Sequence, residues 1–208
     1  MRLTTQDIVA ANMAQRRYLL GIRQKGKHMT AKECIEGRRS VRKFTDAPVS
    51  DEVLKEVVAT AAYAPSWKNT QVTRYIAVKD QAVKERIADD IAPLWIGNTN
   101  IIKGAPLLVA VTIVKGRSGY ERDGSFSTSK GTHFQSFDAG IATEAFCLAA
   151  HEKGLGTVIM GIFEEAKVVE ALSIPETQEV AALLAVGYPD ETPVAPKRKD
   201  VTDLLSFV

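Results

Sequence analysis

The chain has 208 residues, of which 45% are hydrophobic and 25% charged, and its formal net charge is +2. This composition is typical of a globular protein and excludes disordered and collagen-like chains. The length allows one sizeable core, so a single domain is the default expectation. The two cysteines, Cys34 and Cys147, are too few for a disulfide framework, which favours a reducing, cytoplasmic setting.

The charge is unevenly distributed along the chain. Residues 1–30 hold six Lys or Arg residues and a single Asp, so the remainder is mildly acidic, which argues against nucleic acid as the main ligand. No apolar run approaches the roughly 20 residues that span a bilayer, and the N-terminus lacks the pattern of a secretory signal. We therefore interpret residues 1–29 as a basic leader helix, native or vector-derived, and residues 30–208 as the folded domain.

Two helices are well marked early in that domain. Thr30 followed by Glu33 forms a capping box, which predicts a short helix that ends near Gly37. Ser50 can cap a second helix, whose apolar residues form one stripe and which cannot continue past Pro65. This second helix is therefore expected to pack on the core.

Two further helices are predicted in the second half. Residues 138–154 are apolar nearly all round, which is typical of a central helix packed on several sides. Asp138 at its start is interpreted as an N-cap rather than a catalytic acid, and Cys147 as a small core residue. The last helix is expected near residues 164–172, before Pro175.

Short apolar runs between the helices predict buried strands, so the expected fold is α/β (α+β), with one sheet and helices on its faces. The predicted strands are 74–78, 106–114, 157–163 and 181–188. Residues 116–131 are rich in Gly and Ser and bury too little to hold themselves in place. This segment is predicted to be a mobile loop over a site, or a plain surface connection.

Several reaction classes lack their sequence signatures. The three histidines have no i,i+4 partner and there is no HExxH, so no metal site is expected. A G-x-S-x-G elbow and a P-loop are also missing, and Ile159 stands where a dinucleotide fingerprint begun at Gly154 needs its third glycine. A good core without catalytic triad or metal favours an enzyme whose cofactor carries the chemistry.

Three polar segments carry the candidate binding chemistry. "GRRSVRKF" (37–44) places four cations in six positions, which suits either a solvated face or a bound anion. "APSWKNTQ" (64–71) follows the second helix, and "GYPDETPVAPKRK" (187–199) follows the last strand. Together with "DAGIATEAFCLAAHEKGLGT" (138–157), these segments resemble the nitroreductase family in order and spacing, over residues 33–200.

The resemblance implies an FMN-binding nitroreductase-like domain over 30–208, with a central mixed, mainly antiparallel sheet of four to five strands flanked by helices. It also implies a homodimer with FMN at the interface, to which the second chain contributes Pro65, Ser66 and Asn69. Gly161 would lie against the flavin ring. The residues implied for the phosphate, ribityl chain and pyrimidine edge are Arg38, Arg39, Ser40, Arg42, Lys197 and Arg198, because Arg presents a fork of donors that matches phosphate oxygens.

By the same resemblance, NADH or NADPH passes a hydride to flavin N5, and a nitroaromatic, quinone or similar small-molecule acceptor is then reduced in a ping-pong scheme. No general acid and no nucleic-acid or membrane partner is expected. Two alternatives stay open. One is a protein that binds FMN for storage or sensing, and the other is a specialised relative that fragments flavin or dehalogenates its substrate.

Overall fold

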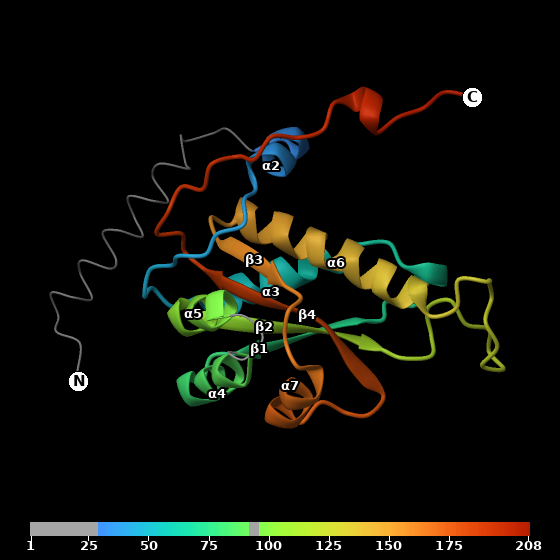
Figure 1. Ribbon diagram of the computed structural model, residues 1–208, viewed down its shortest axis with the longest axis horizontal. Coiled ribbons are helices and arrows are strands. Elements are labelled where there is room, and N and C mark those ends of the chain that lie inside the picture. Colours follow the sequence, from blue (N-terminus) through green and yellow to red (C-terminus); the bar gives the residue numbers. More distant parts are fainter. Residues whose placement is uncertain (1–28, 92–95) are drawn as a thin grey trace, which may run out of the picture.

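The computed structural model describes residues 29–91 and 96–208, so the helix predicted within residues 1–28 lies outside the described residues. The described chain forms one antiparallel sheet with helices on both faces (Figure 1). Its strands are β1 (Thr73–Val78), β2 (Leu107–Val114), β3 (Gly156–Met160) and β4 (Gln178–Gly187). Its helices are α2 (Ala31–Gly37), α3 (Asp51–Ala61), α4 (Gln81–Ile91), α5 (Ile96–Gly104), α6 (His133–Glu152) and α7 (Glu165–Leu172), with 3-10 turns η1 (Trp67–Asn69) and η2 (Val201–Asp203).

The strand order is β1-β2-β4-β3, and every neighbouring pair is antiparallel. β2 and β4 fill the centre, and a register shift between Val111 and Thr112 bends their pairing. One parallel bridge, between Ser40 and Thr157, adds the segment after α2 to the outer edge of β3. The predicted mainly antiparallel sheet of four to five strands is thus confirmed, with four strands in the described chain.

The central strands divide the core into two layers because successive side chains of a strand point to opposite faces. Leu107, Val109 and Val111 pack with α3 and α6 on one face. Leu108 and Ala110 pack with α4, α5 and α7 on the other. Figure 1 shows α3 and α6 on one side of the sheet and α4 and α7 on the opposite side.

The helix caps follow the predicted local chemistry. The Thr30 hydroxyl accepts the Glu33 N–H at 3.2 Å while the Glu33 carboxylate accepts the Thr30 N–H at 2.8 Å, which completes the capping box of α2. The Ser50 hydroxyl accepts the Val53 N–H at 3.2 Å at the start of α3. Both predicted helix starts are confirmed, and Cys147 is buried in the core as expected.

The central helix differs from its prediction. α6 begins at His133, five residues before the predicted start, so Asp138 lies inside the helix and the interpretation as an N-cap is wrong. Its carboxylate instead accepts hydrogen bonds from two other segments. The apolar pattern begins at Asp138, whereas the helix extends through the more polar turn before it.

The loop at 116–131 is anchored more firmly than its composition suggested. Ser118 is fully buried, and the Gly116 N–H donates to the side-chain oxygen of Gln135 at 2.7 Å. The rings of Tyr120 and Phe126 pack with centroids 4.9 Å apart across an isolated bridge. The expectation that this segment cannot hold itself in place was therefore wrong.

Two helices, α4 and α5, were not predicted. Among residues 29–91 and 96–208, no helix is long and apolar enough to cross a membrane. The same residues contain no group of three or more His, Cys, Asp or Glu side chains suited to a metal ion.

Candidate functional site

The basic segment, residues 37–44, runs along the edge of β3. The Val41 N–H donates to the carbonyl of Thr157 at 2.9 Å, next to the parallel bridge of Ser40. Gly156 permits this close approach, because a Cβ there would lie 2.7 Å from the Cβ of Val41. The position of the basic segment is therefore set by main-chain pairing and a glycine contact.

The three arginines of the basic segment have different surroundings. Nε of Arg38 lies 3.4 Å from a Glu144 carboxylate oxygen of α6, yet this buried Nε makes no hydrogen bond among the described residues. Arg39 donates to the main-chain carbonyls of Glu36 and Arg38, at 2.5 and 2.7 Å. Arg42 is exposed and makes one long contact of 3.3 Å, to the Ser40 carbonyl. Arg38 and Arg42 thus keep donors for an incoming anion.

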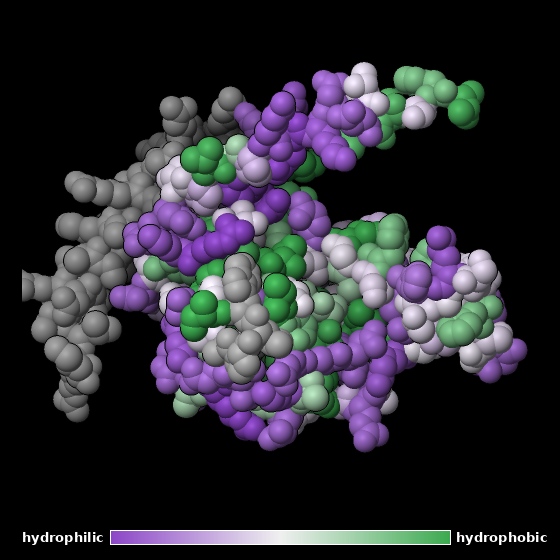
Figure 2. All heavy atoms as spheres, in the orientation of Figure 1, coloured by the Kyte–Doolittle hydropathy of each residue, from purple (hydrophilic) through white to green (hydrophobic). Residues whose placement is uncertain are grey.

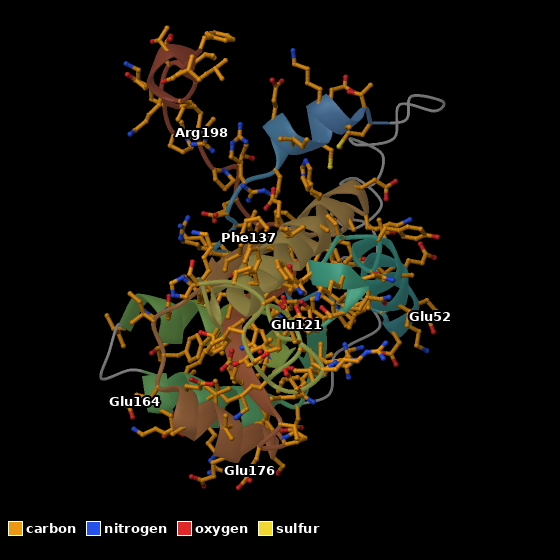
Figure 3. The ribbon with its side chains drawn as sticks, turned by 90° about the vertical axis from the view of Figure 1, so that its right-hand side faces the viewer. Glu52, Glu121, Phe137, Glu164, Glu176 and Arg198 are labelled. Atoms are coloured by element: carbon orange, nitrogen blue, oxygen red, sulfur yellow. The ribbon has the colours of Figure 1, made fainter. Side chains whose placement is uncertain are left out.

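The segment after β4 returns to this site. A Glu191 carboxylate oxygen accepts the N–H groups of Arg42 and Lys43, at 2.5 and 3.2 Å. Beyond this anchor the chain is exposed: Arg198 donates to the Pro196 carbonyl at 3.3 Å and lines a shallow hollow with Lys197. Figure 3 shows Arg198 on this outlying segment, away from the sheet. No hydrogen bond or ion pair of the described part links it to the basic segment.

His151, in the last turn of α6, lies beside the start of the basic segment. Its Nε2 would be 3.0 Å from a Cβ at Gly37, so the glycine leaves the ring room that a larger residue would restrict. Burial, and then the positive charges of Arg38 and Arg39, lower the pKa of His151 below its ordinary value of 6.5. The neutral imidazole therefore fills space without adding to the local positive charge.

The second predicted group lies on the turn at 64–71, which has an unusual backbone. Lys68, Asn69 and Gln71 have φ angles of 45°, 56° and 47°, in the left-handed region that side-chain-bearing residues rarely adopt. The Ser66 hydroxyl accepts the Gln71 N–H at 2.9 Å and closes the turn. Pro65 and Asn69 are exposed on it.

Asp138 connects this turn to α6. One of its carboxylate oxygens accepts the Trp67 N–H at 2.9 Å and the Ser118 hydroxyl at 2.7 Å, and the residue is 3% exposed. Asp138 also borders an open hollow of about 370 Å³ between α3, the turn and β1. Tyr75 lines the same hollow, and burial raises the pKa of its hydroxyl to about 12.

Gly161 follows the last residue of β3 and is exposed. A Cβ there would meet nothing within 4 Å, so open space lies beside the main chain. The next residue is held from α5, where the side-chain amide of Asn98, which is buried, donates to the Ile162 carbonyl at 3.0 Å. The edge of β3 thus combines the basic segment with an accessible stretch of backbone.

A family model described as "Nitroreductase family" matches residues 35–99 and 96–188. The chain belongs to the nitroreductase family. A putative NADH dehydrogenase/NAD(P)H nitroreductase of Methanothermobacter thermautotrophicus is 30% identical over 169 residues, which are 79% of this chain and 80% of that relative.

Solved structures of two other proteins share this fold. An NADPH:FMN oxidoreductase from Vibrio harveyi, complexed with NAD⁺, is 25% identical with a TM-score of 0.71, over 85% of this chain and 76% of that chain. A BluB-like flavoprotein from Clostridium difficile 630 is 26% identical with a TM-score of 0.71, over 86% of this chain and 99% of that one.

In this nitroreductase-family chain, the predicted site residues form separate groups. Arg38, Ser40 and Gly161 border β3, whereas the turn that carries Ser66 and Asn69 lies near the N-terminal end of α6. Figure 1 shows the segment that follows α3 at the opposite end of α6 from α2. Among the described residues, no hydrogen bond or ion pair joins the group at β3 to the turn at 64–71.

Asp138, Trp67 and Ser118 were not predicted as parts of the site's framework. The available signal was a carboxylate at the start of a nearly all-apolar run. A buried charge needs dedicated donors, and here these come from two other segments.

Proposed function

We propose that this protein is an FMN-dependent oxidoreductase that takes electrons from NADH or NADPH. The observation that carries the proposal is the basic segment paired to β3 at Thr157, with open backbone at Gly161 just beyond the other end of the same strand, in a nitroreductase-family fold. The relative from Vibrio harveyi, an NADPH:FMN oxidoreductase, supports the same assignment. FMN, when bound, supplies the capacity to accept a hydride and to pass two electrons onward.

The residues present fit a phosphate-bearing flavin. The buried Nε of Arg38 lacks a hydrogen-bond partner among the described residues, and Arg42 is exposed. We assign Arg38, Arg39, Ser40 and Arg42 to the phosphate, ribityl chain and pyrimidine edge. Arg198, with Lys197, would close on the phosphate from the C-terminal segment, which requires that segment to move inward from its outlying position.

The two groups of site residues support a homodimer. Since Ser66 and Asn69 lie far along α6 from the basic segment, we propose that they contact the flavin held by a second chain. Phe137 and Ile159 are 62% and 48% exposed, and Gly140 on α6 has nothing within 4 Å of a Cβ position. Figure 2 shows hydrophobic side chains at the surface over β3 and α6, below the C-terminal segment. Such a face is suited to contact with a partner.

We further propose that the donor and a nitroaromatic or quinone acceptor occupy the same space beside Gly161 in turn, which gives ping-pong kinetics. Arg42 would stabilise negative charge at the pyrimidine edge. The other site residues would position the flavin and the substrates and exclude water. None of them is assigned as a general acid. Both cysteines are free, which supports a reducing, cytoplasmic setting.

An absorption spectrum of the purified protein tests the cofactor assignment. Visible flavin bands, with FMN rather than FAD released on heating, are the expected result. A colourless protein that takes up no added FMN would overturn the proposal.

Steady-state kinetics test the proposed mechanism, and the molecular mass in solution tests the proposed homodimer. NADH or NADPH should bleach the bound flavin, and a quinone or nitroaromatic should restore its colour. Bleaching that fails with both donors would favour an FMN storage or sensing protein instead. Parallel double-reciprocal lines are expected for a ping-pong scheme, whereas intersecting lines contradict it. Light scattering should give twice the chain mass, and Phe137→Asp should lower it.

A further inference from the structure

We infer that Asp138 is a positioning residue that fixes the turn at 64–71 and the loop at 116–131 relative to each other through one carboxylate oxygen. The inference rests on the proposed function only where it extends to flavin affinity, because the turn carries Ser66 and Asn69. The coupling between the two segments rests on the geometry alone.

The Asp138 carboxylate is buried. Asp138 is 3% exposed inside α6, and no ion pair to it is found in the described chain. Removing a carboxylate from water is costly unless hydrogen bonds replace the water. Its acceptor oxygen is used twice, by the Trp67 N–H at 2.9 Å and by the Ser118 hydroxyl at 2.7 Å. These two donors are what make the buried charge tolerable.

The turn at 64–71 has an unusual backbone. Three side-chain-bearing residues in the left-handed region persist only where the surroundings over-determine them. Trp67 directly precedes them, and Asp138 holds its N–H. The Trp67 ring also packs on Phe134 of α6, with centroids 4.4 Å apart. Asp138 thus anchors the turn at Trp67, directly before the first left-handed residue, Lys68.

The loop at 116–131 contacts the same carboxylate. Ser118 is fully buried, so its hydroxyl has a fixed direction toward Asp138. A second, exposed link joins the same two segments, because the Lys68 ammonium donates to Glu121 at 2.9 and 3.0 Å. Ser127 donates to the same carboxylate at 2.6 Å, and Figure 3 shows Glu121 on the loop in front of α6. Movement of the loop is therefore transmitted to the turn.

Three variants separate the links. Asp138→Ala removes the acceptor for both segments, Ser118→Ala removes only the loop's donor, and Asp138→Asn keeps an oxygen that can accept from both donors. Asp123→Ala is the matched control, because the hydrogen bonds of Asp123 within the described chain stay in the loop tip, to the N–H and hydroxyl of Ser125 at 3.0 and 2.6 Å.

Hydrogen exchange measured by mass spectrometry reads the coupling directly, in the purified protein with and without added FMN. We expect Asp138→Ala to speed exchange in both the turn and the loop. Ser118→Ala should speed it in the loop and, more weakly, in the turn. The variant Asp138→Asn should stay near wild type, and the control should change only the loop tip.

Unchanged turn exchange in both Asp138→Ala and Ser118→Ala would overturn the inference. If Asp138→Ala does not fold, Ser118→Ala decides by itself.

The binding of FMN gives a second readout. We expect the Kd for FMN to rise about tenfold in Asp138→Ala, the size expected for one lost hydrogen bond to a charged group. The rise should be smaller in Ser118→Ala and absent in the control. Tight FMN binding by wild type with an unchanged Kd in Asp138→Ala would overturn the extension to flavin affinity. A wild-type protein that binds no FMN would refute the proposed function instead, and the exchange data would still decide the coupling.

Discussion

The basic segment and the turn at 64–71 are the two halves of the candidate site, and they are built in opposite ways. In the basic segment the backbone pairs with β3 at Thr157, and the distinctive feature is a set of charged side chains, which are the proposed ligand contacts. In the turn the distinctive feature is the backbone, which has three left-handed residues. It is anchored by the hydrogen bond from the Trp67 N–H to Asp138 of α6.

The difference shows how each half responds to substitution. The charged side chains of the basic segment can be removed with little effect on the fold, because its main-chain pairing and the buried side chains of Val41 and Phe44 remain. The turn depends on conformations that particular residues must tolerate. We therefore expect the basic segment to separate ligand affinity from stability, whereas the turn couples the two.

The largest effect is expected for Arg38→Ala combined with Arg42→Ala. Each hydrogen bond to a charged group contributes about 1.5–3 kcal/mol, so the Kd for FMN should rise about 100-fold or more. Isothermal titration with FMN measures it. Arg86→Ala is the control, since this exposed α4 residue pairs with Glu170 at 2.6 Å. Equal affinities for the double variant and this control would contradict the assignment of the basic segment.

A stability effect is expected where the basic segment packs. In Gly156→Ala the new methyl group would lie 2.7 Å from the Cβ of Val41, and overpacking of this kind costs about 1–3 kcal/mol. Gly161→Ala should leave stability unchanged, because its Cβ meets nothing within 4 Å. Urea denaturation compares the two variants, and similar midpoints would show that β3 and the basic segment do not pack closely.

A smaller effect on stability is expected from substitutions in the turn at 64–71. Gln71 has a φ of 47°, a conformation that costs about 1–2 kcal/mol for a residue with a side chain and little for glycine. Gln71→Val should lower the free energy of unfolding by about 1 kcal/mol, whereas Gln71→Gly should hold or raise it. Thermal and urea unfolding measure both. A Gly variant less stable than the Val variant would contradict the left-handed conformation.

The smallest effect concerns pH at the basic segment. The pKa of His151 is lowered in the folded chain, so the unfolded chain binds the proton more readily. Stability from the neutral ring is fully present above the unfolded pKa of 6.5 and is lost as the pH falls from there toward the lower folded value. His151→Gln should therefore lose less stability than wild type between pH 7.5 and 5.5. Parallel pH curves from urea denaturation would show that His151 does not titrate differently on folding.

Local signals account for what could be predicted from the sequence. The capping residues Thr30 and Ser50 act within their own helices, and the apolar runs of β2 and β4 mark a buried sheet without reference to distant residues. The basic segment was equally visible, because its charges are adjacent in the chain.

The features that were missed depend on contacts between distant segments. Asp138 was read as an N-cap because its partners, Trp67 and Ser118, are 71 and 20 residues away. The left-handed residues of the turn carry no glycine signal, since they are Lys68, Asn69 and Gln71. Tertiary contacts fix both features, and local propensity does not encode them.

The bridge between Ser40 and Thr157 also bears on solubility. β3 is an edge strand, and an open edge offers unpaired N–H and C=O groups to other chains. The Val41 N–H donates to one of these carbonyls, that of Thr157. The neighbouring arginines place like charges at the edge, which repel a second copy of the sheet. A chain shortened to begin after this segment would thus lose a candidate anion site and expose an aggregation-prone edge together. The residues proposed to bind a ligand thus also cover part of the sheet's edge.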